Sequence, residues 1–145
     1  MYIKKLLKPT YRKMIELSIS AKCYNSANLS KIEQHKNKFK NKRCFIIGNG
    51  PSLRVEDLEK LDSEVTMASN SMYILFDKTN WRPSYYFCQD PVMLTKIIKN
   101  IRKIKCTKFI GSTGKFKHTD KNAAYYKIDS ENYYNGDKPK FSDDV

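Results

Sequence analysis

The chain has 145 residues, of which 40% are hydrophobic and 30% charged, so its composition favours one globular domain over a disordered chain. No run of 18 or more apolar residues occurs, and the basic start lacks the uninterrupted apolar core of a signal peptide. Transmembrane and secreted classes are therefore not expected, and we expect a cytoplasmic protein. The formal net charge of +13 indicates either an anionic partner or a lysine-rich solvated surface, because lysines are spread along the whole chain.

Residues 1–22 can form a basic helix. Its apolar positions are Leu6, Leu7, Met14, Ile15, Leu17 and Ile19, and Pro9 is expected to break or start it. Such a helix can lie at the inner face of a membrane as a peripheral contact, or it can pack on the domain with its charges in water. Residues 23–42 are polar and predict a linker with a short helix around 30–38. The sequence thus divides into an N-terminal helix and linker, 1–42, and a compact domain, 43–145.

From Arg43 onward, strand-like and helix-like segments alternate. The expected strands are "CFIIG", "EVTMAS", "SYYFCQD", "CTKFIG" and "AAYYKID", and the segments between them include "SLRVEDLEKL", "NSMYILFDKT" and the strongly periodic "PVMLTKIIKNIRKI". This alternation predicts an α/β fold of the Rossmann-like type, a parallel sheet with right-handed crossovers and helices on both faces. Trp81 is expected to be a packing residue before the third strand.

Cysteine and histidine offer little chemistry. The cysteines are Cys23, Cys44, Cys88 and Cys106, and no two have the spacing of a C-x-x-C pair. The last three lie in strand-like runs, where we expect small buried hydrophobic residues and no disulfide framework. With only His35 and His118 available, no metal site is predicted.

Small or polar residues follow each of the first four expected strands. They are Gly48-Asn49-Gly50-Pro51-Ser52, then Ser69-Asn70-Ser71, then Gln89-Asp90-Pro91, then Gly111-Ser112-Thr113-Gly114. The carboxyl ends of parallel strands meet at one edge of the sheet, where ligands bind in open α/β folds. This convergence predicts a ligand edge more strongly than any single motif does.

The first of these turns has a physical rationale of its own. Gly48 and Gly50 permit close approach of a ligand to the backbone, and Pro51 presets a turn. Ser52 can cap the following helix, whose N-terminus would attract a phosphate. The alternative is a strand-to-helix turn without a ligand, and the residues alone do not separate the two. Asp90 either serves the ligand edge or caps the helix beginning at Pro91, and we favour the cap.

Two familiar nucleotide motifs are excluded, and nucleic acid is not expected as a partner. Leu53 stands where the dinucleotide fingerprint needs its third glycine, and "GSTGK" fails the P-loop pattern at Phe109 and Phe116. Tyrosines that could stack on bases are Tyr125, Tyr126, Tyr133 and Tyr134, which lie in a polar tail. They do not interleave with basic residues on one surface, so nucleic-acid binding is not predicted.

The segments "CFIIGNGPSL", "SN" after the second strand and "DKTNWRPSYYFCQDPVM" together resemble a family of bacterial proteins encoded with capsule and lipopolysaccharide genes. That family is related to the bacterial α-2,3-sialyltransferases and shares a fold-level likeness with the 6-hydroxymethylpterin diphosphokinases. The resemblance runs from about residue 42 to residue 144.

The resemblance implies a glycosyltransferase of cell-surface polysaccharide biosynthesis with a CMP-sugar donor and a glycan acceptor. It places Gly48, Asn49, Gly50, Pro51 and Ser52 at the donor, and Asn70 matches a family asparagine near it. Asp90 stands at the corresponding position of the third strand, where the sialyltransferases tend to carry asparagine. The catalytic residues stay unassigned, because neither histidine stands where that family has its general base.

Two further expectations follow from the resemblance. The similar proteins continue beyond "KFSDDV", so the sheet is expected to be incomplete at its C-terminal side and to leave an apolar face that favours homo-oligomers. The alternative function is a nucleotide-dependent pyrophosphotransferase, in which Asp90 would help hold Mg²⁺, or a non-catalytic nucleotide-binding module. No other cofactor is expected.

Overall fold

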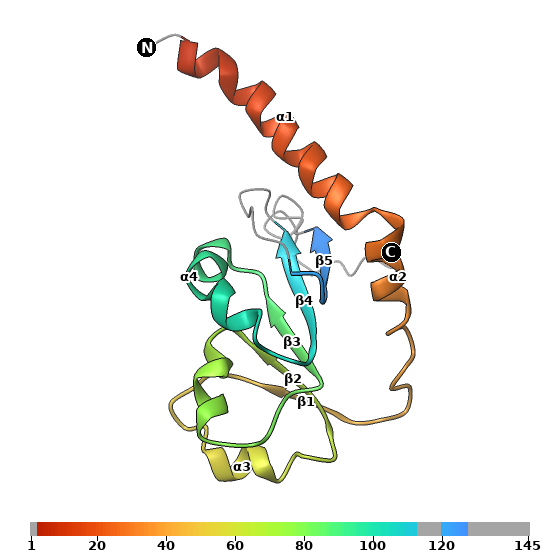
Figure 1. The fold of residues 1–145 in the computed structure, drawn as a ribbon, viewed down its shortest axis with the longest axis vertical. Helices are drawn as coiled ribbons and strands as arrows, with labels where there is room; N and C mark the ends of the chain where they lie inside the picture. The colour runs from red at the N-terminus through yellow and green to blue at the C-terminus, as the bar shows by residue number, and fades with distance from the viewer. Residues whose placement is uncertain (1–2, 113–119, 128–145) are drawn as a thin grey trace, which may run out of the picture.

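The computed structural model describes residues 3–112 and 120–127 (Figure 1). The elements in chain order are α1 (Ile3–Cys23), α2 (Ser26–Glu33), β1 (Cys44–Ile47), α3 (Val55–Glu59), β2 (Val65–Ser69), the 3₁₀ helix η1 (Asn70–Asp77), β3 (Tyr85–Cys88), α4 (Pro91–Ile101), β4 (Thr107–Ser112) and β5 (Ala123–Lys127). All five strands pair in parallel, in the spatial order β1-β2-β3-β4-β5. The predicted α/β fold with a parallel sheet is confirmed.

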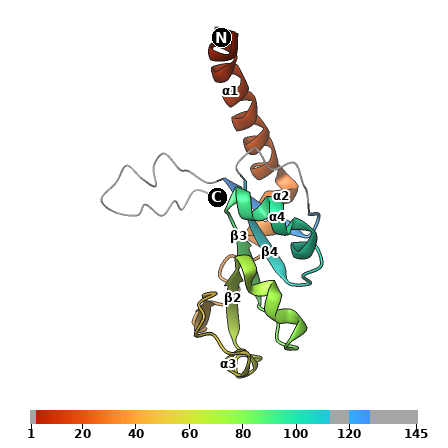
Figure 2. The ribbon, with the colours of Figure 1, turned by 90° about the vertical axis from the view of Figure 1, so that its left-hand side faces the viewer.

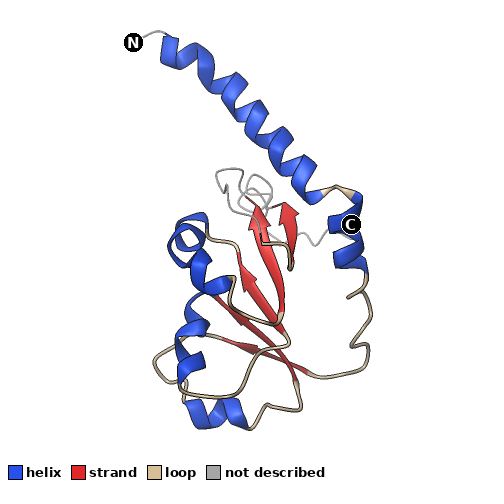
Figure 3. Cartoon of the chain, viewed as in Figure 1, coloured by secondary structure: helices blue, strands red, loops and turns tan. Residues whose placement is uncertain are grey.

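The helical segments flank this sheet on two sides. Figure 3 shows α3 and α4 on one side and α2 on the other. Because the spatial order of the described strands follows the chain order, right-handed crossovers carry successive helices to the same side. The strand order also never reverses among these five strands, so they form no crevice of the kind found at a reversal point. A ligand at the carboxyl ends of these strands would therefore lie along that edge of the sheet and not in a crevice.

The N-terminal helices differ in detail from the prediction. The helix predicted over 1–22 is confirmed as α1, but it runs through Pro9, so the expected break there is wrong. The second helix begins earlier than the expected 30–38, because Asn25 supplies an N-cap whose side chain accepts a hydrogen bond from Asn28 N at 2.9 Å. Asparagine is a strong N-cap residue, and this local signal in the polar linker marks the true start.

The core lies between the sheet and the helices of the crossover side. One row of residues crosses the sheet in register, and all five are buried: Ile47, Ala68, Tyr86, Lys108 and Ala123. The apolar side chains of α4 that pack in the same core are Leu94, Ile97, Ile98 and Ile101. Trp81 is 2% exposed, which confirms its predicted packing role.

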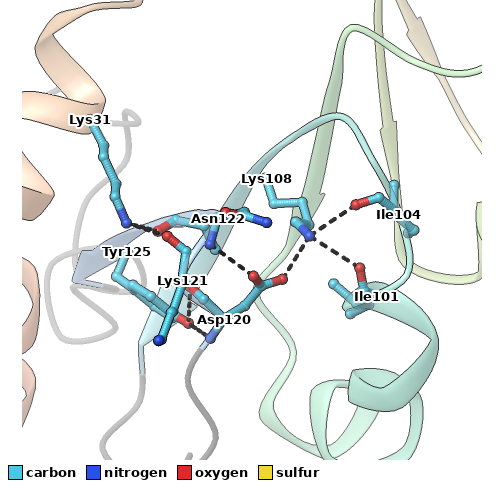
Figure 4. A network of polar contacts seen from close by, with 9 residues as sticks. Lys31, Ile101, Ile104, Lys108, Asp120, Lys121, Asn122 and Tyr125 are labelled. Carbon is cyan, nitrogen blue, oxygen red and sulfur yellow. Dashed lines mark hydrogen bonds and ion pairs between the residues drawn. The ribbon is translucent and has the colours of Figure 1, made fainter.

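The charged member of this row, Lys108, is fully buried (Figure 4). Its ammonium forms an ion pair with Asp120 at 2.7 Å and donates to the carbonyls of Ile101 at 3.4 Å and Ile104 at 3.0 Å. These carbonyls lie at and just beyond the C-terminus of α4, where a positive charge interacts favourably with the helix dipole. Lys108 therefore joins β4, the end of α4 and the segment that leads into β5.

The opposite face of the sheet carries an aromatic cluster near the middle strands. Phe87 and Phe109 stack with ring centroids 5.2 Å apart, and His35 and Phe39 contact Tyr85 from the segment after α2. This face is more exposed at β1, which is an edge strand of the sheet. There Cys44 is exposed and Ile46 is 84% exposed. Association of copies through such a face stays a prediction.

Thiol reactivity should report which strands are open to solvent. We expect Cys44 to react first with a thiol reagent in the native protein at pH 8, because it is exposed. Burial raises the pKa of Cys88 and of Cys106 to about 11, so less than about 1% of either is thiolate at that pH. Spectrophotometric titration of native protein and of a Cys44→Ser variant checks this. Retention of the fast phase in the variant would contradict it. The expectation that all three strand cysteines are buried holds for Cys88, is wrong for Cys44, and is met only in part by Cys106, which is half-buried.

Candidate ligand edge

The turn after β1 is open. A Cβ built on Gly48 would meet no atom of the described residues within 4 Å, and one built on Gly50 would meet only Ser52 Oγ, at 3.8 Å. Neither glycine adopts the left-handed backbone conformation that favours this residue type. Glycine is therefore required here neither by the turn's geometry nor by packing against the described part of the chain. It leaves backbone exposed to whatever approaches from outside.

The same turn is not joined to a helix N-terminus. Leu53 N donates to Gly50 O at 3.1 Å, which closes a turn with Pro51 at its second position, where proline is favoured. The helix α3 begins only at Val55, and its N-cap, Arg54, makes no side-chain capping bond. The predicted cap by Ser52 is therefore wrong. The helix has five residues and starts beyond the turn, so it supplies no phosphate site to it.

The turn is instead tied to the end of β2. Asn49 Nδ2 donates to Ser69 O at 2.9 Å, next to Asn70. Asn70 has φ 52°, the left-handed region in which asparagine is tolerated better than most residues. The structure thus brings Asn49 and Asn70 to adjacent strand ends, as the sequence predicted for a parallel sheet.

A tyrosine of the core also serves this edge. Tyr86 is fully buried, and its hydroxyl donates to the carbonyl oxygen of Asn70. Burial raises the pKa of Tyr86 far above its ordinary value, so the hydroxyl stays protonated and keeps donating at neutral pH. Its strand position predicts burial, but only the register of β2 and β3 shows that the hydroxyl reaches Asn70.

Asp90 caps α4. Its Oδ1 accepts hydrogen bonds from Val92 N at 2.7 Å and Met93 N at 2.9 Å, and the helix begins at Pro91 as predicted. The interpretation of Asp90 as an N-cap is confirmed, so one carboxylate oxygen of this candidate site residue is already committed. Its neighbour Gln89 accepts a hydrogen bond from Tyr126 Oη at 3.3 Å, and burial raises the pKa of Tyr126 to about 12.

Several other residues singled out in the sequence lie within strands or fall outside the described part of the chain. Gly111 and Ser112 lie within β4 and not after it, and Thr113, Gly114 and His118 fall outside the described residues. Tyr125 is not in a polar tail, since it lies in β5 and is 6% exposed. Tyr133 and Tyr134 are outside the described part of the chain.

Two hollows among the described residues lie away from the predicted ligand residues. A cavity of 330 Å³ at the amino ends of β4 and β5 is lined by basic side chains that include Lys31 and Lys105, with His35 beside them. His35 Nδ1 lies 3.1 Å from Tyr85 Oη, and burial, followed by the charge of Lys38, lowers the pKa of this imidazole. A second cavity, of 620 Å³, lies between η1 and the C-terminal end of α4. His35 is thus at the opposite end of the strands from the ligand edge.

Comparison with known proteins adds no family. No protein-family model matches the chain, and neither the curated proteins nor the solved structures contain a significant match. Among the described residues, no three His, Cys, Asp or Glu side chains are grouped so that they could hold a metal ion. The fold therefore defines the class, a Rossmann-like α/β protein, with a candidate ligand edge at the ends of β1, β2 and β3.

Proposed function

We propose that the ends of β1 and β2 bind the nucleotide part of a CMP-sugar, in a glycosyltransferase of the sialyltransferase-like type that acts in cell-surface polysaccharide biosynthesis. The observation that carries the proposal is the open backbone at Gly48, which lacks a side chain although no described neighbour would exclude one. Together with the sequence resemblance of "GNGPSL" to the donor turn of that family, this favours a ligand over a bare turn.

The strand ends offer the contacts that a ribose and a phosphate need. Backbone N–H groups at an open glycine turn can donate to phosphate oxygens without steric obstruction. Asn49 is held against β2 by its bond to Ser69, which fixes the turn before a ligand arrives. Asn70 follows directly, and its backbone is fixed by Tyr86. Pre-organised donors of this kind lose little conformational entropy on binding.

Transfer of the sugar to an acceptor needs two further kinds of group, and no residue of the ligand edge is assigned to either role. A base must deprotonate the acceptor hydroxyl, and cationic or tyrosine donors must stabilise the departing nucleotide phosphate. His35 is at the other end of the strands, as its contact with Tyr85 shows. The proposal therefore assigns donor binding to the described residues and leaves the catalytic base open.

The alternative, a pyrophosphotransferase that binds ATP with Mg²⁺, has less support. It would use Asp90 as an oxygen ligand for the metal, but the Oδ1 of this residue already accepts two backbone N–H groups of α4. Calorimetric titration separates the two functions. We expect heat of binding with CMP and none with ATP and magnesium, whereas the opposite result would favour the alternative.

Substitution at Gly48 tests the site itself. We expect Gly48→Val to leave the free energy of unfolding within about 0.5 kcal/mol of the parent, because a Cβ at this position meets no described atom within 4 Å. It should weaken CMP binding at least about tenfold, the equivalent of about 1.4 kcal/mol, because it occupies the space of the ligand. Ser63→Val, in an exposed turn at the other end of the sheet, is the matched control. Equal CMP affinity in Gly48→Val and the control would contradict the donor site.

A further inference from the structure

Helix α1 projects from the body of the protein. Figures 1 and 2 both show its N-terminal part extending well past the sheet, while its C-terminal end reaches α2 and β5. The attachment is made near its end, where Ile19 is 8% exposed and Cys23 is 3% exposed, and where Lys22 Nζ lies 3.8 Å from the ring centroid of Tyr125. The helix is thus fixed at one end and free of described neighbours along much of its length.

The projecting part carries an exposed apolar stripe. Tyr11, Met14 and Leu17 are 62%, 65% and 62% exposed, and their spacing of three residues keeps them on one side of successive turns. Single exposed apolar residues are ordinary on protein surfaces. Three such large side chains on one unsupported helix form a face instead, and such faces mark interaction sites.

The charge of α1 selects among possible partners. Its 21 residues contain six basic side chains, Lys4, Lys5, Lys8, Arg12, Lys13 and Lys22, and one acidic one, Glu16. A second copy would bring the same positive helix against it, which like-charge repulsion opposes. A nucleic acid would satisfy the charges but would leave the apolar stripe in water. An anionic bilayer surface satisfies both, since its headgroups attract the lysines and its acyl boundary accepts the stripe.

We propose that α1 docks the protein on an anionic phospholipid surface, lying in the interface with Tyr11, Met14 and Leu17 toward the acyl chains. None of the described helices is long and apolar enough to cross a membrane, so α1 is assigned to the interface plane. In Figure 1, α1 extends beyond the end of the sheet to which β4 and β5 point. The inference rests on α1 alone and is independent of the proposed nucleotide site.

Vesicle flotation of the full chain tests the docking. We expect the protein to float with vesicles of phosphatidylcholine and phosphatidylglycerol in a 3:1 mixture and to stay behind with phosphatidylcholine alone. Met14→Glu combined with Leu17→Glu should abolish flotation. The control, Ile74→Glu, places one such charge at a 56% exposed apolar residue of η1 and should float like the parent.

The basic side chains should contribute separately from the stripe. Lys13→Glu should weaken binding to the anionic vesicles by at least about fivefold, the equivalent of about 1 kcal/mol per charge near the surface. Lys96→Glu, an exposed position of α4, makes the same charge change away from α1 and should have the smaller effect. Raising the salt concentration to about 1 M, where the Debye length is about 3 Å, should weaken binding of the parent.

A spectroscopic signal locates the stripe in the membrane. The chain has one tryptophan, and Trp81 is buried, so Tyr11→Trp adds a reporter whose emission should shift to the blue on anionic vesicles. Flotation of the Met14→Glu, Leu17→Glu variant equal to that of Ile74→Glu would overturn the proposal. The proposal would also be overturned if the parent does not float with vesicles but forms dimers, as measured by light scattering, and the same two substitutions dissociate these dimers.

Discussion

Replacing Lys108 with methionine is expected to lower the free energy of unfolding by about 3–5 kcal/mol, the usual cost of removing one partner of a buried ion pair. In the variant, the carboxylate of Asp120 loses the ammonium that lies 2.7 Å from it. Because Asp120 is only 7% exposed, its charge is then buried without a cationic partner. The carbonyls of Ile101 and Ile104 also lose the ammonium that satisfies them beyond the end of α4. Urea denaturation followed by circular dichroism measures the change.

A double-mutant cycle isolates the ion pair from the other roles of these side chains. Asp120→Asn keeps an acceptor for Asn122 N, which donates to Asp120 Oδ1 at 2.9 Å, and removes only the charge. We expect Lys108→Met and Asp120→Asn together to cost clearly less than the sum of the two single changes, because the double variant buries no unpaired charge. Costs that add would show that the two charges do not interact.

An exposed ion pair provides the control for this experiment. Lys60 lies 2.9 Å from Asp57, and the Lys60 side chain is 70% exposed. Exposed pairs of this kind contribute little, because water and salt screen them and holding two long side chains costs entropy. Lys60→Met should leave the denaturation midpoint close to that of the parent. A loss as large as that of Lys108→Met would mean that burial is not what makes the Lys108 pair important.

The sequence predicted the sheet because that prediction depends on local periodicity. "CFII", "VTMAS" and "YYFC" are short apolar or β-branched runs, and the helix beginning at Pro91 follows an Asp-Pro pair that is a strong local start signal. Asp90 could therefore be assigned as a cap from its neighbours alone. The start of α3 was missed, because Ser52 has a capping residue's chemistry but the chain turns once more before the helix begins.

Contacts between distant segments could not be predicted in the same way. A lysine within "TKFIG" indicates a solvated face, and only the register that aligns Lys108 with Tyr86 and Ala123 shows that it points into the core. The hydroxyl of Tyr86 reaches Asn70 for the same reason. At the ligand edge, the sequence could place glycine and asparagine at adjacent strand ends. It could not show that the space around Gly48 is open, so that no described neighbour requires a residue as small as glycine there.

Asn28 gives the largest expected effect outside the ion pair. Its side-chain amide forms two hydrogen bonds with the backbone of β5. Nδ2 donates to Tyr125 O at 2.8 Å, and Oδ1 accepts from Tyr125 N at 2.7 Å. Nδ2 also donates to Cys23 O at 2.7 Å, and the residue is 5% exposed. The side chain thereby joins α1, α2 and the outer edge of the sheet, across 97 positions of sequence.

Asn28→Leu keeps the volume of the side chain but leaves three backbone groups without it. At about 1–3 kcal/mol for each unsatisfied buried group, we expect a loss of at least about 3 kcal/mol in the free energy of unfolding. The amide of Tyr125 should also exchange its hydrogen faster. Gln34→Leu, which removes an exposed amide from the same helical segment, is the control and should change neither quantity appreciably.

Asn28→Asp should make the attachment of α2 sensitive to pH. The new carboxylate can still accept from Tyr125 N, but when ionised it faces the carbonyls of Tyr125 and Cys23, to which the amide donated. Burial and these carbonyls favour the protonated form, so the folded-state pKa should lie above the unfolded value of about 3.9. The favourable contribution of that proton is complete below about pH 4 and is lost as the pH rises through the folded-state pKa. The difference in unfolding free energy between variant and parent should therefore grow from pH 4 to pH 7. A difference that does not change with pH would mean that the carboxylate reaches water and that α2 no longer holds the edge of β5.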